Sequence, residues 1–346
     1  MVKCLVTKLQ GVVNNPNLLK IGEMPIYVKS SASTNAKEYK LSIQTQKDTV
    51  IKIVGDGYFT DASLSANNGK EQEILANTTT DLYFSNGDYK AVISDKYNIL
   101  QFSLANDNSK AHNNISVNLD DFMFSANLKT LTLSNSDSFG NIESLYNKSK
   151  LANVFLLNTN VRGNANGLNV NNLLNFDLCV NNIEYDISNL KNTTNLNLVS
   201  FANTTLQSGN ISSLANNRNI KRIGDLGKGL SGDISVLSNF KALVQNTIRN
   251  YSNNITGDIG KIPDCIVFFI SNVPKEYTYS KGSRTVILSV SNVKLSNIDT
   301  FLNDMAGLSA SSNYKVLTLI GTRTSASDAA VQTLQSKGYT VSITPA

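Results

Sequence analysis

Residues 128–145 read Leu-Lys-Thr-Leu-Thr-Leu-Ser-Asn-Ser-Asp-Ser-Phe-Gly-Asn-Ile-Glu-Ser-Leu, and this stretch decides the fold because its pattern returns along the chain. It joins an apolar L-x-x-L-x-L run to a glycine that is followed by asparagine. A glycine followed by Asn or Asp, with Tyr185 replacing the glycine once, recurs at positions 140, 163, 185, 209, 232 and 257. Successive positions are 22 to 25 residues apart. A period of this length predicts a stack of repeated structural units.

Each repeat has a simple physical interpretation. The L-x-x-L-x-L run predicts a short strand with every second side chain turned inward. The strands are followed by Asn135, Asn158 and Asn181, and asparagine tolerates the left-handed backbone of a tight corner. One repeat cannot bury its own apolar face, so neighbouring repeats must stack. Such corners account for part of the 48 asparagines among the 346 residues.

The repeats resemble the leucine-rich repeat family, in the variant whose second half reads x-x-G-x-I-P. The segments Leu230-Ser-Gly-Asp-Ile-Ser-Val-Leu237 and Asn254-Ile-Thr-Gly-Asp-Ile259 match this variant, although no proline follows the isoleucine. The resemblance implies a curved parallel sheet that serves as a binding surface. We assign residues 120–284 to this leucine-rich-repeat solenoid.

The C-terminal residues 285–346 predict alternating strands and helices. Val286–Val290, Val316–Ile320 and Tyr339–Ile343 have the pattern of strands, and residues 296–305 have helical spacing. A second helix is expected over 325–338, with Ser325 as its cap and Gly338 after its end. This β-α-β-α-β order predicts a parallel sheet that continues and caps the solenoid. Gly321 stands alone after its strand, which is too little glycine for a nucleotide-binding loop.

The N-terminal residues have a different character. Between 25 and 119, six or seven short alternating segments are separated by turn clusters, which predicts an antiparallel β-sandwich. Residues 1–24 are expected to form an N-terminal arm. The fold class is therefore mostly β with an α/β C-terminal part: a sandwich, then a leucine-rich-repeat solenoid with a curved parallel sheet, then a helical cap.

Composition excludes several classes of protein and site. The sequence has one histidine, His112, so it cannot form a zinc site with two histidines. It also excludes a Ser-His-Asp mechanism that uses a second histidine as a base. The cysteines Cys4, Cys179 and Cys265 are far apart, so they form neither a disulfide framework nor a metal knuckle. Cys179 and Cys265 fall in solenoid strands and are expected to be buried. We predict no cofactor.

Charge and hydropathy narrow the set of partners. The net charge is +5 with evenly spread lysines, which does not make the basic stripe that nucleic-acid binding needs. No run approaches the ~20 apolar residues of a membrane span, so no membrane insertion is expected. The first eleven residues lack the apolar block of a signal peptide, which favours an unprocessed protein made in a reducing compartment.

The acidic residues that could carry chemistry each have a structural explanation. Asp56, with Asp61 nearby, lacks the ligand order of a calcium loop and indicates a turn. Asp120 and Asp121 are adjacent, so on a strand they would face opposite ways. Asp186, Asp233 and Asp258 recur in register, so they serve the geometry of the repeat. We therefore predict no catalytic residue, no metal ligand and a non-enzymatic role.

Exposed aromatic side chains are the candidate binding residues, because they suit contact with carbohydrate or protein. The candidates within and just after the repeats are Phe155, Tyr185, Phe201, Tyr251, Tyr277 and Tyr279.

Several segments together resemble the repeat-containing virion proteins of crAss-like tailed bacteriophages of gut Bacteroidales. They are Val2–Leu9, Ile21–Met24, Ile53–Thr60, the repeats, and Leu319–Tyr339. The resemblance implies a structural or adhesive tail-fibre or head-fibre protein, assembled in the host cytoplasm into the virion. It implies other virion proteins as partners, with a host-surface polysaccharide as a second possibility, and a homo-oligomer, with a trimer favoured.

Two alternative functions would require other features in the sequence. A bacterial cell-surface leucine-rich-repeat adhesin would carry a signal peptide or a lipoprotein cysteine after an apolar block. A glycan-degrading tail spike would need paired acids on one concave face, and the sequence shows no evident pair. Asp177, Glu184 and Asp225 are the residues at which loss of polysaccharide cleavage would establish such an enzyme.

Overall fold

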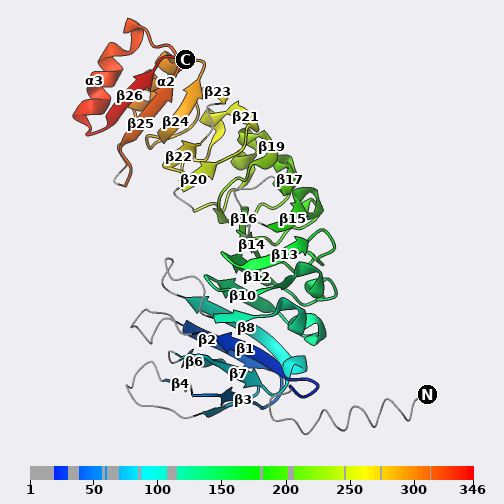
Figure 1. Cartoon of the computed structure of the whole chain (residues 1–346). Helices are drawn as coiled ribbons and strands as arrows, with labels where there is room; N and C mark the ends of the chain where they lie inside the picture. Colours follow the sequence, from blue (N-terminus) through cyan, green and yellow to red (C-terminus); the bar gives the residue numbers. More distant parts are fainter. Residues whose placement is uncertain are drawn as a thin grey trace. The chain divides into compact units, whose positions relative to one another are not determined.

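The computed structural model describes residues 19–29, 39–56, 59–60, 70–84, 87–106, 115–179, 182–201, 206–244, 247–272, 275–311 and 313–346 (Figure 1). The chain divides into two compact units, Met1–Gly163 and Asn164–Ala346, and each is treated by itself. The predictions for Cys4, Asp61, His112, Asn181 and most of the N-terminal arm lie outside the described residues.

The first unit begins with two antiparallel sheets, as the sandwich prediction requires. One sheet has the order β5 (Glu71–Ile74), β3 (Thr49–Val54), β7 (Tyr89–Ile93), β1 (Met24–Val28) and β9 (Ile115–Val117). The other contains β4 (Phe59–Thr60), β6 (Thr80–Phe84), β2 (Tyr39–Thr45) and β8 (Ile99–Asn106). Alternate residues such as Ile26, Leu41 and Phe102 are fully buried, which gives these strands their common core.

The sandwich leads into the repeats without a break in the second sheet. The free edge of β8 pairs in parallel with β10 (Thr130–Ser134), and β10 pairs in parallel with β12 (Asn153–Leu157). Leu131 of β10 lies opposite Phe102 of β8, so the buried faces are continuous. The 3-10 turn η2 (Leu119–Phe124) closes this junction, because the ring of Phe122 meets that of Phe102 edge-on at 5.0 Å.

The repeats form two rows of parallel strands. In the second unit the first row contains β14 (Asn175–Leu178), β16 (Leu198–Phe201), β18 (Arg222–Ile223), β20 (Thr247–Asn250) and β22 (Phe268–Ser271). The second row contains β15 (Asn182–Asp186), β17 (Gln207–Asn210), β19 (Gly229–Asp233), β21 (Asn254–Asp258) and β23 (Glu276–Thr278). The first unit ends with the same two rows, its second row being β11 (Phe139–Asn141) and β13 (Asn160–Asn164).

A polar side chain caps a 3-10 turn after most strands of the second row. The capped turns are η4 (Ile187–Leu190), η5 (Ile211–Leu214), η6 (Ile234–Asn239) and η7 (Ile259–Lys261), whereas η3 (Ile142–Leu145) has no side-chain cap. Asp186, Asp233 and Asp258 each accept a hydrogen bond of 2.8 Å from the backbone N–H two residues on. The prediction that these acids serve the repeat geometry is therefore confirmed.

The corner residues have the backbone that the sequence analysis expects. Asn135 and Asn158 have φ values of 50° and 58°, and the Asn158 side chain donates to that of Asn135 at 3.0 Å. The repeat glycines also have positive φ, +107° at Gly209. A Cβ atom at Gly209 would lie 2.6 Å from Oδ1 of Asp186, so the glycine leaves room for the cap of the preceding repeat.

The C-terminal residues confirm the β-α-β-α-β prediction. The parallel strands β24 (Ser289–Leu295), β25 (Val316–Ile320) and β26 (Thr340–Thr344) are connected by α2 (Ile298–Ala306) and α3 (Asp328–Ser336). The short turn η8 (Ser325–Ser327) precedes α3, and Gly338 ends it with a φ of +86°. Each helix has nine residues, and no helix in the described part of the chain is long and apolar enough to cross a membrane.

Replacing Gly209 by alanine is expected to destabilise the repeats by about 1–3 kcal/mol, because the residue has positive φ and faces the Asp186 cap. Urea unfolding followed by circular dichroism measures this loss. Gly307→Ala is the matched control, since Gly307 has a φ of −79° and its added Cβ would make an ordinary 3.5 Å contact with the Asp304 carbonyl oxygen. Equal midpoints for the two variants would contradict the role assigned to Gly209.

Candidate functional site

The structure corrects four of the six aromatic residues predicted to form an exposed binding surface. Tyr185, Phe201, Tyr277 and Tyr279 are buried, with exposed fractions between 0 and 5%. They fill the interior of the repeats, so the prediction is wrong for these four. Phe155 in the first unit and Tyr251 in the second are partly exposed.

The buried rings are large core residues with specific partners. Tyr185 replaces the repeat glycine and packs edge-on against Phe176, with 5.0 Å between the ring centroids. Tyr277 packs edge-on against Phe269 at 5.6 Å, and its hydroxyl accepts a hydrogen bond of 2.6 Å from the Asn250 side chain. The buried Tyr185 hydroxyl, in contrast, has no hydrogen-bond partner among the described residues.

The outward side of the first-row strands in the second unit, β14 to β22, is here called the sheet face. Phe176 and Leu178 of β14 are buried, so the alternating residue Asp177 points outward. Asp177 lies opposite Ser200 of β16, and Arg249 of β20 lies opposite Ile270 of β22. A parallel bridge between Leu226 and Asn250 links the two halves of the row.

A group of polar residues on this face, here called the charged cluster, comprises Asp177, Cys179, Ser200, Arg222, Asp225, Arg249 and Tyr251. The Cys179 N–H donates to Asp177 Oδ1 at 3.1 Å, and Cys179 Sγ lies 3.2 Å from Ser200 Oγ. Asp225 accepts a hydrogen bond from the Tyr251 side chain. Cys179 and Cys265 are both partly exposed, so the prediction that they are buried is wrong.

The electrostatics of the charged cluster link its two acids. Burial raises the pKa of Asp177, although the positive charge of Arg222 opposes this. Burial also raises the pKa of Asp225, which Arg249 and Tyr251 lower and the negative charge of Asp177 raises further. Burial, followed by the charge of Asp177, raises the pKa of the Cys179 thiol to about 12, so this thiol stays protonated.

The structure thus brings together two of the three acids named for a glycan-degrading site. Asp177 and Asp225 belong to the charged cluster, whereas Glu184 lies in the second row, where it accepts from the Asn164 side chain at 3.2 Å. Acids of raised pKa can exchange protons with a ligand, and the flanking arginines can bind anionic groups. The sequence offers both residues as candidate acids but does not show that they lie together, because they are two repeats apart along the chain.

An aromatic pair lies next to the charged cluster on the sheet face. Phe268 of β22 stacks on Tyr314 with 4.7 Å between ring centroids and 17° between the planes. The Tyr314 hydroxyl is 3.1 Å from Thr247 Oγ1, and Thr247 lies opposite Phe268 in the sheet. Phe268 belongs to an apolar run of five residues, so alternation could not reveal that it faces outward.

The other acidic candidates serve local structure. Asp120 accepts from the Asn141 N–H at 3.1 Å, and Asp121 pairs with Lys96 at 2.8 Å, so the adjacent acids have separate partners. The cap of their turn is Asn118 and neither aspartate. Asp56 lies in an exposed bend after β3. Within the described ranges, no group of three His, Cys, Asp or Glu residues could hold a metal ion.

Comparison with known proteins finds solved structures of low similarity. No family model matches the sequence, and no curated protein matches it. The chain is similar to an internalin (inlF) from Listeria monocytogenes, with 16% identity over 69% of this chain and 83% of that one and a TM-score of 0.38. It is also similar to the PEPR1–AtPEP1 structure, with 17% identity over 60% of this chain and 37% of that one and a TM-score of 0.38.

The fold is a leucine-rich-repeat solenoid. Its own geometry carries this conclusion: a period of 22 to 25 residues, two rows of parallel strands, and a capped 3-10 turn after the second row.

Asp177→Asn is expected to raise the urea midpoint at neutral pH. Because the pKa of Asp177 is raised in the folded chain, the folded state binds this proton more tightly than the unfolded chain does. Stability therefore falls as the pH rises from the ordinary aspartate pKa through the raised value, and the neutral amide avoids this loss. Below the ordinary pKa, the variant and the original chain should have equal midpoints.

Asp264→Asn supplies a control of opposite sign. Burial acts to raise the pKa of Asp264, but hydrogen bonds from Thr285 and Val286 and the charge of Arg284 leave it lowered. Its contribution to stability is therefore present at neutral pH and is lost as the pH falls through the lowered value, so this variant should lose stability at neutral pH. A lower midpoint for Asp177→Asn at neutral pH would contradict the burial argument.

Proposed function

We propose that this chain is a non-enzymatic binding protein of a bacteriophage particle, a tail-fibre or head-fibre component, whose sheet face holds a partner protein of the virion. The observation that carries the binding role is the composition of that face. It places two arginines of the charged cluster beside a stacked aromatic pair. Arginine and aromatic side chains dominate the binding energy of protein interfaces.

The arrangement of charge also favours binding over catalysis. Arg222 acts on Asp177 and Arg249 acts on Asp225, so each acid has its own cation. A partner that covers this face would meet positive and negative groups in alternation. Such a pattern favours partners whose own charges are complementary to it. Burial of the two acids has a cost in stability, and such a cost is typical of residues retained for function.

The virion role is supported by the resemblance of the sequence to repeat proteins of crAss-like phages. A fibre protein acts in several copies, and a trimer is the expected assembly. The host-surface polysaccharide is the second partner to test, since stacked aromatics also suit sugar rings. A bacterial surface adhesin with the same fold would expose the same sheet face on the cell instead.

Arg249→Ala and Phe268→Ala should each weaken binding to the proteins of dissociated phage particles by about ten-fold or more, the loss typical of a central interface residue. The measurement is surface plasmon resonance on the immobilised chain. Lys228→Ala is the control, because Lys228 is exposed and belongs to neither the charged cluster nor the aromatic pair. Binding only to host capsular polysaccharide, or cleavage of it that Asp177→Asn abolishes, would overturn the proposal.

Antibodies raised against the chain should label purified particles of a crAss-like phage in immunogold microscopy. Light scattering of the purified chain should give three times the chain mass, as a fibre trimer requires. Label confined to the bacterial surface would favour the adhesin and contradict the virion role. A strict monomer that binds no phage component would contradict it as well.

A further inference from the structure

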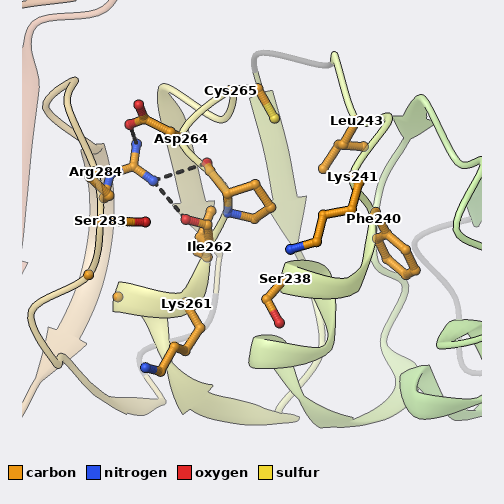
Figure 2. A pocket seen from close by; sticks show the side chains of 13 residues that line it. Ser238, Phe240, Lys241, Leu243, Lys261, Ile262, Asp264, Cys265, Ser283 and Arg284 are labelled. Carbon is orange, nitrogen blue, oxygen red and sulfur yellow. Dashed lines mark hydrogen bonds and ion pairs between the residues drawn. The ribbon is translucent and has the colours of Figure 1, made fainter.

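A second candidate site lies away from the sheet face, at the turns that follow η6 and η7. A hollow of about 450 Å³ is lined there by residues of three consecutive repeats (Figure 2). Ser238, Gly260 and Gly282, each from a different repeat, line it. A Cβ on Gly260 would clash with the Ser280 carbonyl oxygen, and one on Gly282 would clash with the Gly260 carbonyl oxygen, so these glycines let the neighbouring turns approach closely beside the hollow.

Polar side chains link neighbouring repeats on both sides of the hollow. In the repeat before it, the buried Asn217 side chain donates to the Leu190 carbonyl oxygen at 3.2 Å. In the repeat after it, Arg284 donates to the Ile262 carbonyl oxygen at 2.8 Å. Phe240, which also lines the hollow, is buried, and its side chain has no hydrogen-bond donor.

The lining has an excess of positive charge. Lys241 and Lys261 are exposed, and within the described residues their ammonium groups have no hydrogen-bond or ion-pair partner. The buried guanidinium of Arg284 donates to the carbonyl oxygens of Ile262, Pro263 and Ile266 at 2.8, 3.0 and 2.7 Å. These hydrogen bonds give the guanidinium N–H groups acceptors, but they do not neutralise the positive charge of Arg284.

One carboxylate, that of Asp264, opposes these three cations. It lies 3.8 Å from Arg284, and its oxygens already accept hydrogen bonds from the backbone of Thr285 and Val286. The Asp264 carboxylate is therefore already hydrogen-bonded to the adjacent loop. The hollow keeps a net positive charge that an anionic ligand would neutralise.

The remaining lining residues indicate the rest of the ligand. In Figure 2 the Lys241 ammonium extends over Ser238, while Lys261 lies at the rim. Ser238 and Ser283 are exposed hydroxyls, and Pro263 offers a partly exposed apolar surface above the buried Ile262. Hydroxyls and a small apolar surface beside a cation match a sugar ring that carries an acid group.

We propose that this hollow binds a carboxylate-bearing sugar, a hexuronate unit of an acidic polysaccharide. The carboxylate pairs with the Lys241 ammonium, the sugar hydroxyls bond to Ser238 and Ser283, and the ring packs on Pro263. The volume is in the range of small-ligand sites. The site uses no residue of the sheet face, so it is independent of the proposed partner-protein site.

The test is a nuclear magnetic resonance titration of the full chain with a tetramer of galacturonic acid. The amide signals of Gly260 and Gly282 should shift, and the neutral galactose tetramer should leave them unchanged. Lys241→Gln should weaken binding by about ten-fold or more, the loss of one charge-assisted hydrogen bond. Lys241→Arg keeps the charge and should restore most of the affinity.

Control variants separate this site from the sheet face. Lys228→Ala and Arg249→Ala should leave the galacturonate affinity unchanged, and added salt should weaken it. No shift at Gly260 and Gly282, or equal shifts with the neutral tetramer, would overturn the proposal. Shifts with polyglutamate but not with galacturonate would assign the hollow to an acidic peptide and overturn the sugar assignment.

Discussion

The repeats depend on one contact, which joins the polar cap of a 3-10 turn to the glycine of the next repeat. Asp186 accepts from the Ser188 N–H at 2.8 Å and lies where a Cβ on Gly209 would be only 2.6 Å away. The same arrangement recurs between Asn210 and Gly232. The first N–H groups of a 3-10 turn have no partner within the turn, so a side-chain acceptor stabilises them, and glycine in the next repeat leaves room for that acceptor. This pairing sets the spacing of the whole stack.

Because inward residues and turns carry the stability, the outward residues of the strands are free to differ between repeats. On the sheet face this freedom is used for Asp177, Arg222 and Arg249, which no repeat rule requires. The raised pKa of Asp177 shows that burial is not fully offset by Arg222 there. A stack whose turns are capped can tolerate such a cost, since it falls only on outward residues such as Asp177 and Asp225.

The sequence predicted what repeats locally, and it failed where neighbours in space are distant in the chain. The Gly-Asn and Gly-Asp pairs identified the turns, because the capping residue and the glycine that a turn requires are adjacent in the sequence. The same reasoning could not separate buried from exposed rings. Tyr185 stands at a glycine position and fills the interior, whereas Phe268 stands in an apolar run and faces outward. The Asp177–Asp225 pair needs the register of three strands, which no single repeat contains.

The start of the solenoid illustrates how an open end of a repeat stack is closed. A parallel strand at the edge of a sheet leaves backbone groups without partners, and here β8 of the sandwich supplies them to β10. The register places Leu104 opposite Leu133, so the apolar interior continues across the junction as well as the hydrogen bonds. The boundary at residues 119 and 120 therefore marks a change from antiparallel to parallel strand pairing, and the core is continuous across it. The sandwich acts as the cap of the first repeats.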